Sequence, residues 1–310
     1  MRISLNGLLL PITTPFTLDE KVDSRGLISN IEKWNRVGIT GYVVLGSTGE
    51  RVNLDEREYL EVIEAARRAV PESMTFIVGA GQQSTGTTIQ EVKRAAKAGA
   101  EAVLVITPHY YKSAITQAAL VNHYTAVADG SPVPVILYSM PDLTGIKIEP
   151  ETAAELSGHQ NIIGMKDSSN EIEKFRETVR MSHQDFTMTI GNGTVFAGAL
   201  QAGARGGILA VGCCAPQICL EIYRAVQAGE VDLAGELQEK LIPLARAVTK
   251  TYGIGGLKMA MEMAGYVGGH VRAPLRRPNE EAIAEIRTLL DETAAALVGE
   301  PLAKVSEARP

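Results

Sequence analysis

The chain has 310 residues, of which 45% are hydrophobic, and a net charge of -6 from interspersed acidic and basic residues. This composition is typical of a globular protein with a sizeable core, and it argues against nucleic acid as a partner because that needs a concentrated basic surface. The three cysteines, Cys213, Cys214 and Cys219, have neither CxxC spacing nor a histidine pair to complete a metal site. We therefore expect reduced, buried thiols and no metal.

The N-terminal segment gives no sign of export or of membrane insertion. Its apolar run at residues 8–12 contains Pro11 and leads into Thr-Thr-Pro, which argues against a signal segment and against a spanning helix. No presequence rich in Arg and Ser comes before it. We expect a cytoplasmic protein without a membrane partner, provided that no transit peptide is missing from the sequence.

Eight short runs rich in Val, Ile and Leu recur along the chain, and each is followed by a turn signal and an amphipathic stretch. Several are apolar on both faces, and they begin about 20 to 34 residues apart, which suits one parallel strand and one crossover helix. The predicted strands are 7–13, 41–45, 75–79, 102–107, 133–138, 162–166, 186–190 and 207–211. Eight such units favour an α/β fold, a (β/α)8 TIM barrel, over an open doubly wound sheet, which remains the alternative.

The stretches between these runs carry signals for the ends of helices. Asn53 and Glu56 read as a capping box that opens a helix after the second strand. Gly38, Gly99 and Gly203 are predicted to end helices before the next strand. These signals support the alternation of strands and helices.

After residue 211 the sequence has no further strand signal. Helices are predicted at 216–228, 231–252, 256–265 and 279–298, which is more than one closing helix requires. We expect the barrel over residues 1–228 and a C-terminal helical extension, packed on the barrel, over residues 229–300. The polar residues 301–310 are expected to form a flexible tail.

Lys166 ends the sixth predicted strand, in the segment Gly-Met-Lys-Asp at residues 164–167. In a TIM barrel the chemistry gathers at the C-terminal ends of the strands. A buried ammonium is costly to desolvate, so burial favours a free amine, which can attack a ketone to form a Schiff base. The other interpretation is a lysine that marks the polar exit of the strand, and this strand alone does not separate the two.

Hydroxyl groups follow two other predicted strands. Ser47 and Thr48 lie in the turn Gly-Ser-Thr-Gly-Glu, whose hydroxyls and backbone N–H groups suit a carboxylate or a phosphate. The alternative is an ordinary turn with local hydrogen bonds. Tyr138 ends the strand before that of Lys166, so its phenol and the amine should face the same barrel mouth. It is either a proton shuttle for a carbinolamine or a core tyrosine whose hydroxyl is satisfied.

Signatures of a nucleotide cofactor are missing. The Walker pattern with its lysine is absent, and Gly-Ala-Gly at residues 79–81 lacks the third glycine of a dinucleotide fingerprint. The histidines show no ligand spacing and receive no chemical role. We expect an enzyme without a cofactor.

Five motifs occur in a fixed order along nearly the whole chain. They are Thr-Thr-Pro-Phe at 13–16, the turn at 46–50, Thr-Pro-His-Tyr-Tyr at 107–111, Tyr138 with Pro141 and Thr-Gly at 144–145, and Gly-Met-Lys-Asp at 164–167. Together they resemble the dihydrodipicolinate synthase and N-acetylneuraminate lyase superfamily of class I aldolases. The resemblance implies a TIM barrel in which Lys166 forms an imine with pyruvate, or with the 2-oxo acid being cleaved.

The resemblance also implies roles for other residues. Tyr138 would be the proton shuttle, and Ser47 and Thr48 would serve the substrate carboxylate and the proton relay, with Thr48 counted among the catalytic residues. Tyr110 would complete the relay from a neighbouring subunit. That sharing implies at least a dimer, and we expect a homotetramer, a dimer of dimers.

The rest of the pocket bears on the choice of substrate. By the same likeness, Gly191 and Leu209 would line the pocket around the imine. The synthase branch carries an arginine two positions after the proline of its Tyr-Asn-Val-Pro motif, but that position is Leu143 here, so a bidentate carboxylate contact is lost. The segments 138–141, 161–168, 252–258 and 272–275 look instead like the 4-hydroxy-2-oxoglutarate aldolase branch, in which Ser168 would meet the distal carboxylate.

The sequence therefore predicts a class I, pyruvate-dependent aldolase that cleaves a 4-hydroxy-2-oxo acid, with 4-hydroxy-2-oxoglutarate giving pyruvate and glyoxylate. The iminium supplies the electrophile, so no metal is needed. The alternatives are dihydrodipicolinate synthase, acting on pyruvate and aspartate semialdehyde, and an aldolase or dehydratase for sugar-derived 2-oxo acids. A non-catalytic pyruvate-binding or assembly protein is a hypothesis of another class, and the lysine, the tyrosine and both hydroxyls together argue against it.

Overall fold

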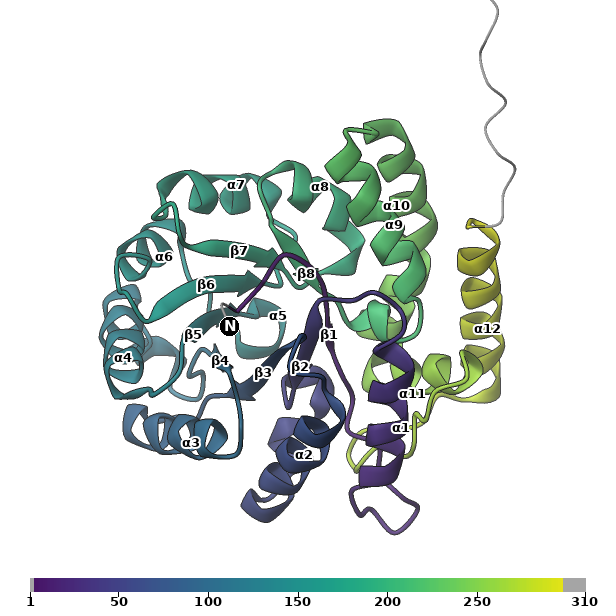
Figure 1. Cartoon of the computed structure of the whole chain (residues 1–310), viewed down its shortest axis with the longest axis horizontal. Helices are drawn as coiled ribbons and strands as arrows, with labels where there is room; N and C mark the ends of the chain where they lie inside the picture. The colour runs from purple at the N-terminus through teal and green to yellow at the C-terminus, as the bar shows by residue number, and fades with distance from the viewer. Residues whose placement is uncertain (1–2, 298–310) are drawn as a thin grey trace, which may run out of the picture.

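The computed structural model describes residues 3–297. Eight parallel strands close into a barrel in chain order, and helices surround it (Figure 1). The strands are β1 Gly7–Pro11, β2 Gly41–Val44, β3 Thr75–Ala80, β4 Ala102–Ile106, β5 Val135–Ser139, β6 Ile162–Asp167, β7 Thr187–Ile190 and β8 Gly206–Ile208. The predicted (β/α)8 barrel is confirmed. The open-sheet alternative is excluded because β1 pairs with β8.

Eight helices that follow the strands or lie between them cover the barrel. They are α1 Ser24–Trp34, α2 Glu56–Ala69, α3 Thr85–Lys97, α4 Gln117–Gly130, α6 Pro150–Leu156, α7 Ile172–Met181, α8 Phe196–Gln201 and α9 Pro216–Ala228. Gly38, Gly99 and Gly203 follow α1, α3 and α8 with φ of 94°, 106° and 108°, as predicted. The capping box of α2 is formed by Asp55 and Glu58, two residues later than predicted, because residues 51–53 form a separate 3-10 turn.

Short helical segments join the C-terminal ends of the strands to the covering helices. They are η1 Ser47–Gly49, η2 Arg51–Asn53, η3 Lys112–Ala114, α5 Pro141–Thr144, η4 Gly193–Val195 and η5 Ala210–Cys213. The sequence analysis missed them, since three or four residues are too few to show an amphipathic period. One of them, η5, takes up residues that were assigned to the eighth strand.

Three further helices follow α9. They are α10 Val231–Arg246, α11 Gly253–Met263 and α12 Glu280–Ala295, and a π-helical turn, η6 Ala247–Thr251, lies between the first two. The helix predicted over 231–252 is therefore helical as far as residue 251, but its last turn is π-helical and not α-helical. Helix α10 packs on α9, and α12 packs on α10 and α11 at the outer edge of the molecule (Figure 1). The predicted boundary at residue 228 falls at the end of α9, while the predicted helix end at 298 and the tail lie outside the described residues.

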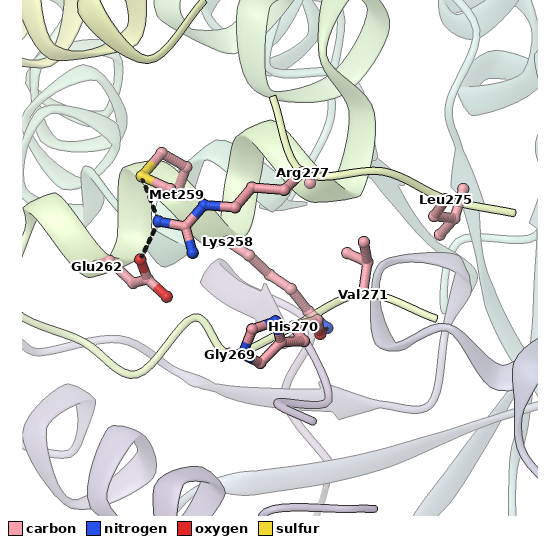
Figure 2. Close-up of a pocket in the computed structure, with 9 residues that line it drawn as sticks. Lys258, Met259, Glu262, Gly269, His270, Val271, Leu275 and Arg277 are labelled. Carbon is pink, nitrogen blue, oxygen red and sulfur yellow. Dashed lines mark hydrogen bonds and ion pairs between the residues drawn. The ribbon is translucent and has the colours of Figure 1, made fainter. Parts of the chain in front are cut away.

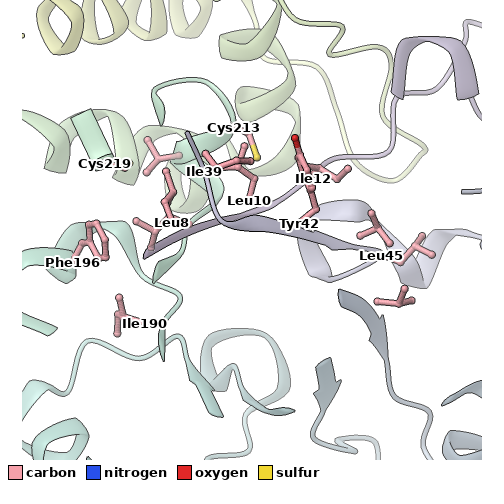
Figure 3. Packing of buried hydrophobic residues seen from close by; sticks show 14 of the residues in the cluster. Leu8, Leu10, Ile12, Ile39, Tyr42, Leu45, Ile190, Phe196, Cys213 and Cys219 are labelled. Carbon is pink, nitrogen blue, oxygen red and sulfur yellow. The ribbon is translucent and has the colours of Figure 1, made fainter. Parts of the chain in front are cut away.

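The core has two layers, and the alternation of side chains along each strand decides which layer a residue joins. On β1, Leu9 belongs to the small cluster inside the barrel, whereas Leu8 and Leu10 belong to the large layer between the strands and the helices (Figure 3). All three are fully buried. The parity of a strand residue therefore determines whether its side chain can reach the barrel interior.

The cysteines lie in the outer layer. Cys213, Cys214 and Cys219 are free and buried, and burial raises the pKa of the Cys214 thiol to about 12. Within residues 3–297, no helix combines the length and the hydrophobicity that crossing a membrane would require.

Candidate active site

Lys166 and Tyr138 lie side by side inside the barrel, near the C-terminal ends of their strands. The two residues are in register across β5 and β6, and the Lys166 Nζ lies 4.5 Å from the centroid of the Tyr138 ring. Each residue is only 4% exposed. The structure thus brings together the amine and the phenol that the sequence predicts at one barrel mouth.

A hydroxyl from the turn after β2 reaches this pair. The Ser47 Oγ lies 3.4 Å from the Tyr138 hydroxyl, and either oxygen can donate the hydrogen bond. Thr48 is also buried, but the described hydrogen bonds do not join it to Tyr138. The structure thus places Ser47, and not Thr48, beside the Tyr138 hydroxyl, and the catalytic role of Thr48 remains a prediction. In a 3-10 turn, successive side chains point about 120° apart, so only one of the two can face Tyr138.

Gly191 and Ser168 lie beside Lys166. A Cβ atom at Gly191 would lie 2.0 Å from the Ser168 Oγ and 2.5 Å from the Lys166 Cε, so a larger residue there would force one of these side chains to move. Ser168 follows Lys166 by two residues and keeps the parity that faces the interior. Its backbone N–H donates to the Ser139 carbonyl at 2.9 Å, which extends the β5–β6 pairing past the end of the strand.

Asp167 lies between Lys166 and Ser168 in sequence, but its side chain has a different environment. Its carboxylate accepts hydrogen bonds from the Ser169 N–H at 2.8 Å and from the Ser169 hydroxyl at 2.9 Å. Burial raises the pKa of the Asp167 carboxyl above its usual value, against the effect of these bonds. Its carbonyl accepts from the Gly191 N–H at 2.6 Å. Asp167 therefore stabilises the loop that carries Ser168, and its carbonyl links this loop to the residue that follows β7.

Leu209 does not line the pocket with its side chain. It is fully buried in the layer between the strands and the helices, whereas Ile208 belongs to the interior cluster that contains Tyr138. Leu209 was assigned by the family resemblance, but successive residues of an extended chain face opposite sides, so Leu209 and Ile208 cannot both face the interior. Ile208 replaces Leu209 as the candidate lining residue.

Tyr110 lies at the surface of this chain. It is 74% exposed, and its ring makes an edge-to-face contact with that of Tyr111, with centroids 5.1 Å apart. Its backbone N–H donates to the Gln83 side chain at 2.9 Å. An exposed aromatic pair is typical of a protein interface. The role of Tyr110 in a neighbouring subunit remains a prediction.

Leu143 lies on α5, directly after the strand of Tyr138. It is 61% exposed, and the preceding Asp142 pairs with Lys250 of η6 at 3.0 Å. Among residues 3–297, no group of three His, Cys, Asp or Glu side chains is arranged to hold a metal ion. The groups gathered at the barrel mouth are instead an amine, a phenol and hydroxyls, which suit nucleophilic attack on a carbonyl with proton transfer.

Comparison with known proteins places this arrangement in a family. The Dihydrodipicolinate synthetase family matches residues 4–293 of the chain. The chain is 33% identical over 289 residues to the 4-hydroxy-tetrahydrodipicolinate synthase of Haloarcula marismortui, covering 93% of this chain and 94% of that protein. It is also 33% identical over 279 residues to the same enzyme of Rhizobium meliloti, covering 90% and 94%.

Solved structures give the same result. A dihydrodipicolinate synthase of Bacillus anthracis superposes with a TM-score of 0.90 at 26% identity, covering 94% of this chain and 99% of that one. YagE, a prophage protein of E. coli K12 from the same family, was solved in complex with pyruvate and superposes with a TM-score of 0.87 at 29% identity, with the same coverage.

These relatives bear the synthase name, whereas the sequence analysis favoured the 4-hydroxy-2-oxoglutarate aldolase branch. The superfamily was predicted correctly, but the aldolase branch is not supported by them. The chain is an enzyme, a carbon–carbon lyase of the Schiff-base aldolase type, and it belongs to the dihydrodipicolinate synthetase family.

Proposed function

We propose that Lys166 forms an imine with pyruvate and that Tyr138 and Ser47 move the protons this requires. The observation that carries the proposal is the contact chain from the Lys166 amine over the Tyr138 ring to the Ser47 hydroxyl. The amine attacks the ketone carbon to give a carbinolamine, and the loss of water then needs an acid beside the leaving hydroxyl. Tyr138 is suitably placed, and Ser47 can return a proton to it. The pyruvate complex of YagE supports pyruvate as the first substrate.

The comparisons and the sequence analysis favour different second substrates. The names of the relatives favour a condensation of the pyruvate imine with aspartate semialdehyde, as in 4-hydroxy-tetrahydrodipicolinate synthase. We therefore place this reaction first. In it, the enamine carbon of pyruvate forms the new carbon–carbon bond to the aldehyde.

One observation favours cleavage of 4-hydroxy-2-oxoglutarate as the second candidate. An aliphatic side chain, Leu143, stands where the synthase branch would hold the aldehyde's carboxylate with arginine. Ser168, two residues beyond the lysine and against Gly191, could donate one hydrogen bond to a distal carboxylate. In this direction the imine withdraws electrons while the bond between C3 and C4 breaks.

Borohydride trapping tests the shared step. Reduction in the presence of pyruvate should add a stable adduct to Lys166, located by peptide mass spectrometry. Lys258, another buried lysine, is the internal control and should stay unmodified, because it is paired with Glu50. A folded protein that gives no adduct at Lys166 would refute the imine.

Two assays separate the candidate reactions. One measures the consumption of aspartate semialdehyde with pyruvate, and the other measures pyruvate release from 4-hydroxy-2-oxoglutarate. Leu143→Arg should raise the activity on aspartate semialdehyde if the missing carboxylate contact limits that reaction. If the unmodified enzyme already prefers the semialdehyde by a wide margin, Leu143 carries no information on specificity and the cleavage candidate fails.

A further inference from the structure

The turn that carries Ser47 is flanked by two residues in an unfavourable backbone conformation. Leu45 has a φ of 59° and Glu50 a φ of 55°. Among residues 3–297, these are two of only three non-glycine residues with positive φ. Residues other than glycine rarely adopt this left-handed backbone conformation, and they keep it only when surrounding contacts hold them in place. The turn therefore depends on outside contacts for its shape.

One such contact comes from the C-terminal part of the chain. The Lys258 Nζ of α11 lies 2.6 Å from the Glu50 Oε1, and the two side chains are 2% and 1% exposed. The same ammonium donates to the His270 carbonyl at 2.6 Å and lies 4.5 Å from the centroid of the Phe16 ring. Figure 2 shows Lys258 running from α11 toward His270. Since a buried charge is tolerated only with such partners, Glu50 and Lys258 constrain each other strongly.

Hydrogen bonds within the turn couple the backbone of Glu50 to that of Ser47. The Glu50 N–H donates to the Ser47 carbonyl at 3.2 Å, and the Gly49 N–H donates to the Gly46 carbonyl at 3.0 Å. On the other side, the Thr14 hydroxyl donates to the Gly49 carbonyl at 2.7 Å. A change in the conformation of Glu50 would therefore move Ser47, whose hydroxyl is only just within reach of Tyr138 at 3.4 Å.

We propose that Lys258 is a positioning residue, which keeps Glu50 in its left-handed conformation and thereby holds the Ser47 hydroxyl against Tyr138. This inference rests on the proposed function, because it assigns Lys258 an effect on imine formation at Lys166. In this proposal Lys258 acts only through Glu50. It makes α11, which lies far from Ser47 in sequence, a part of the catalytic geometry.

The test is the double variant Glu50→Gln with Lys258→Met, which removes both charges together and so leaves neither one buried without a partner. A control with similar contacts, although more exposed at 23% and 36%, is Arg67→Met with Glu101→Gln. Arg67 also pairs with a glutamate, at 3.2 Å, donates to a carbonyl, that of Val70, and lies over a phenylalanine ring, that of Phe76. That pair does not contact the Ser47 turn.

Borohydride reduction at successive times after mixing with pyruvate measures the rate of imine formation for both double variants. For the Glu50/Lys258 variant we expect a rate about 10- to 100-fold below that of the unmodified enzyme, because a small misplacement of a catalytic group is costly. The control should stay within about twofold, at a comparable melting temperature. An unchanged rate in the Glu50/Lys258 variant would overturn the proposal and leave the pair a purely structural role.

A crystal structure of the Glu50/Lys258 variant separates this proposal from the proposed function. If the unmodified enzyme forms no imine, the proposed function fails, but the geometry can still be judged. A Ser47 Oγ displaced from the Tyr138 hydroxyl supports the positioning role. A Ser47 Oγ that stays at the original distance contradicts it, whatever the activity.

Discussion

Lys166 and Tyr138 stand on neighbouring strands at the same level of the barrel, with the Lys166 Nζ 4.5 Å from the centre of the Tyr138 ring. Both side chains are almost completely buried. The register of β5 and β6 is therefore what brings the proposed nucleophile next to its proposed proton donor. The predictions below test the contacts around this pair.

Tyr138→Phe should lower the rate of imine formation and of turnover by about 100-fold or more, because general acid–base catalysis contributes on this scale. The ring that packs against Lys166 is kept, so the melting temperature should change little. Tyr124→Phe is the control, since the Tyr124 hydroxyl donates to the Val105 carbonyl at 3.1 Å in the outer layer. Equal rates for the two variants would show that the Tyr138 hydroxyl plays no part in proton transfer.

Ser47→Ala should slow imine formation more than Thr48→Ala does. The Ser47 hydroxyl lies within 3.4 Å of the Tyr138 hydroxyl, and its removal interrupts the path for protons. We expect a fall of about tenfold or more in kcat for Ser47→Ala, measured by steady-state kinetics. The reverse order of effects would assign the relay to Thr48 instead of Ser47.

Gly191→Ala should abolish most of the activity, because the new methyl group would lie 2.5 Å from the Lys166 Cε and 2.0 Å from the Ser168 Oγ. Either the lysine or the serine must move, and both lie at the proposed reacting centre. Gly198→Ala is the control, since nothing lies within 4 Å of its new Cβ on α8. That control should keep full activity and gain up to about 1 kcal/mol of stability. A fully active Gly191→Ala enzyme would show that the lysine tolerates displacement.

Stability should fall in mildly acidic solution because of His123 on α4. Burial lowers the pKa of His123 from 6.5 to about 4, whereas in the unfolded chain it keeps its ordinary value. Between these two values the unfolded chain binds more protons than the folded protein, so the free energy of unfolding decreases as the pH falls, by up to about 3 kcal/mol.

Denaturant titrations between pH 7 and pH 4 measure this dependence. His123→Asn should flatten the curve in that window, while the matched change at the exposed His183 should leave it unchanged. The Thr85 hydroxyl lies 2.9 Å from the His123 Nδ1, and the shorter asparagine side chain would keep this hydrogen bond only in a weakened form. The variant is therefore also expected to be less stable than the unmodified protein at pH 7. Identical slopes for the unmodified protein and for His123→Asn would rule out His123 as the cause.

The sequence by itself was enough to predict the barrel, because buried parallel strands and their crossover helices leave a repeating apolar pattern that is local in the chain. It was also enough to place Lys166, Tyr138 and the hydroxyl turn at one barrel mouth, since all C-terminal strand ends meet there. Gly191 and Ser168 were placed by the family resemblance, and the structure brings both against Lys166.

Only the tertiary structure decided the finer points. Ser47 rather than Thr48 meets Tyr138, and Ile208 rather than Leu209 faces the barrel interior, because the orientation of a side chain depends on the turn geometry and strand register of single residues. The pair of Glu50 and Lys258 joins segments about 200 residues apart, and a pairing of this kind leaves no local pattern in the sequence. Periodicity reveals which face of an element is buried, whereas contacts between distant elements exist only once the chain has folded.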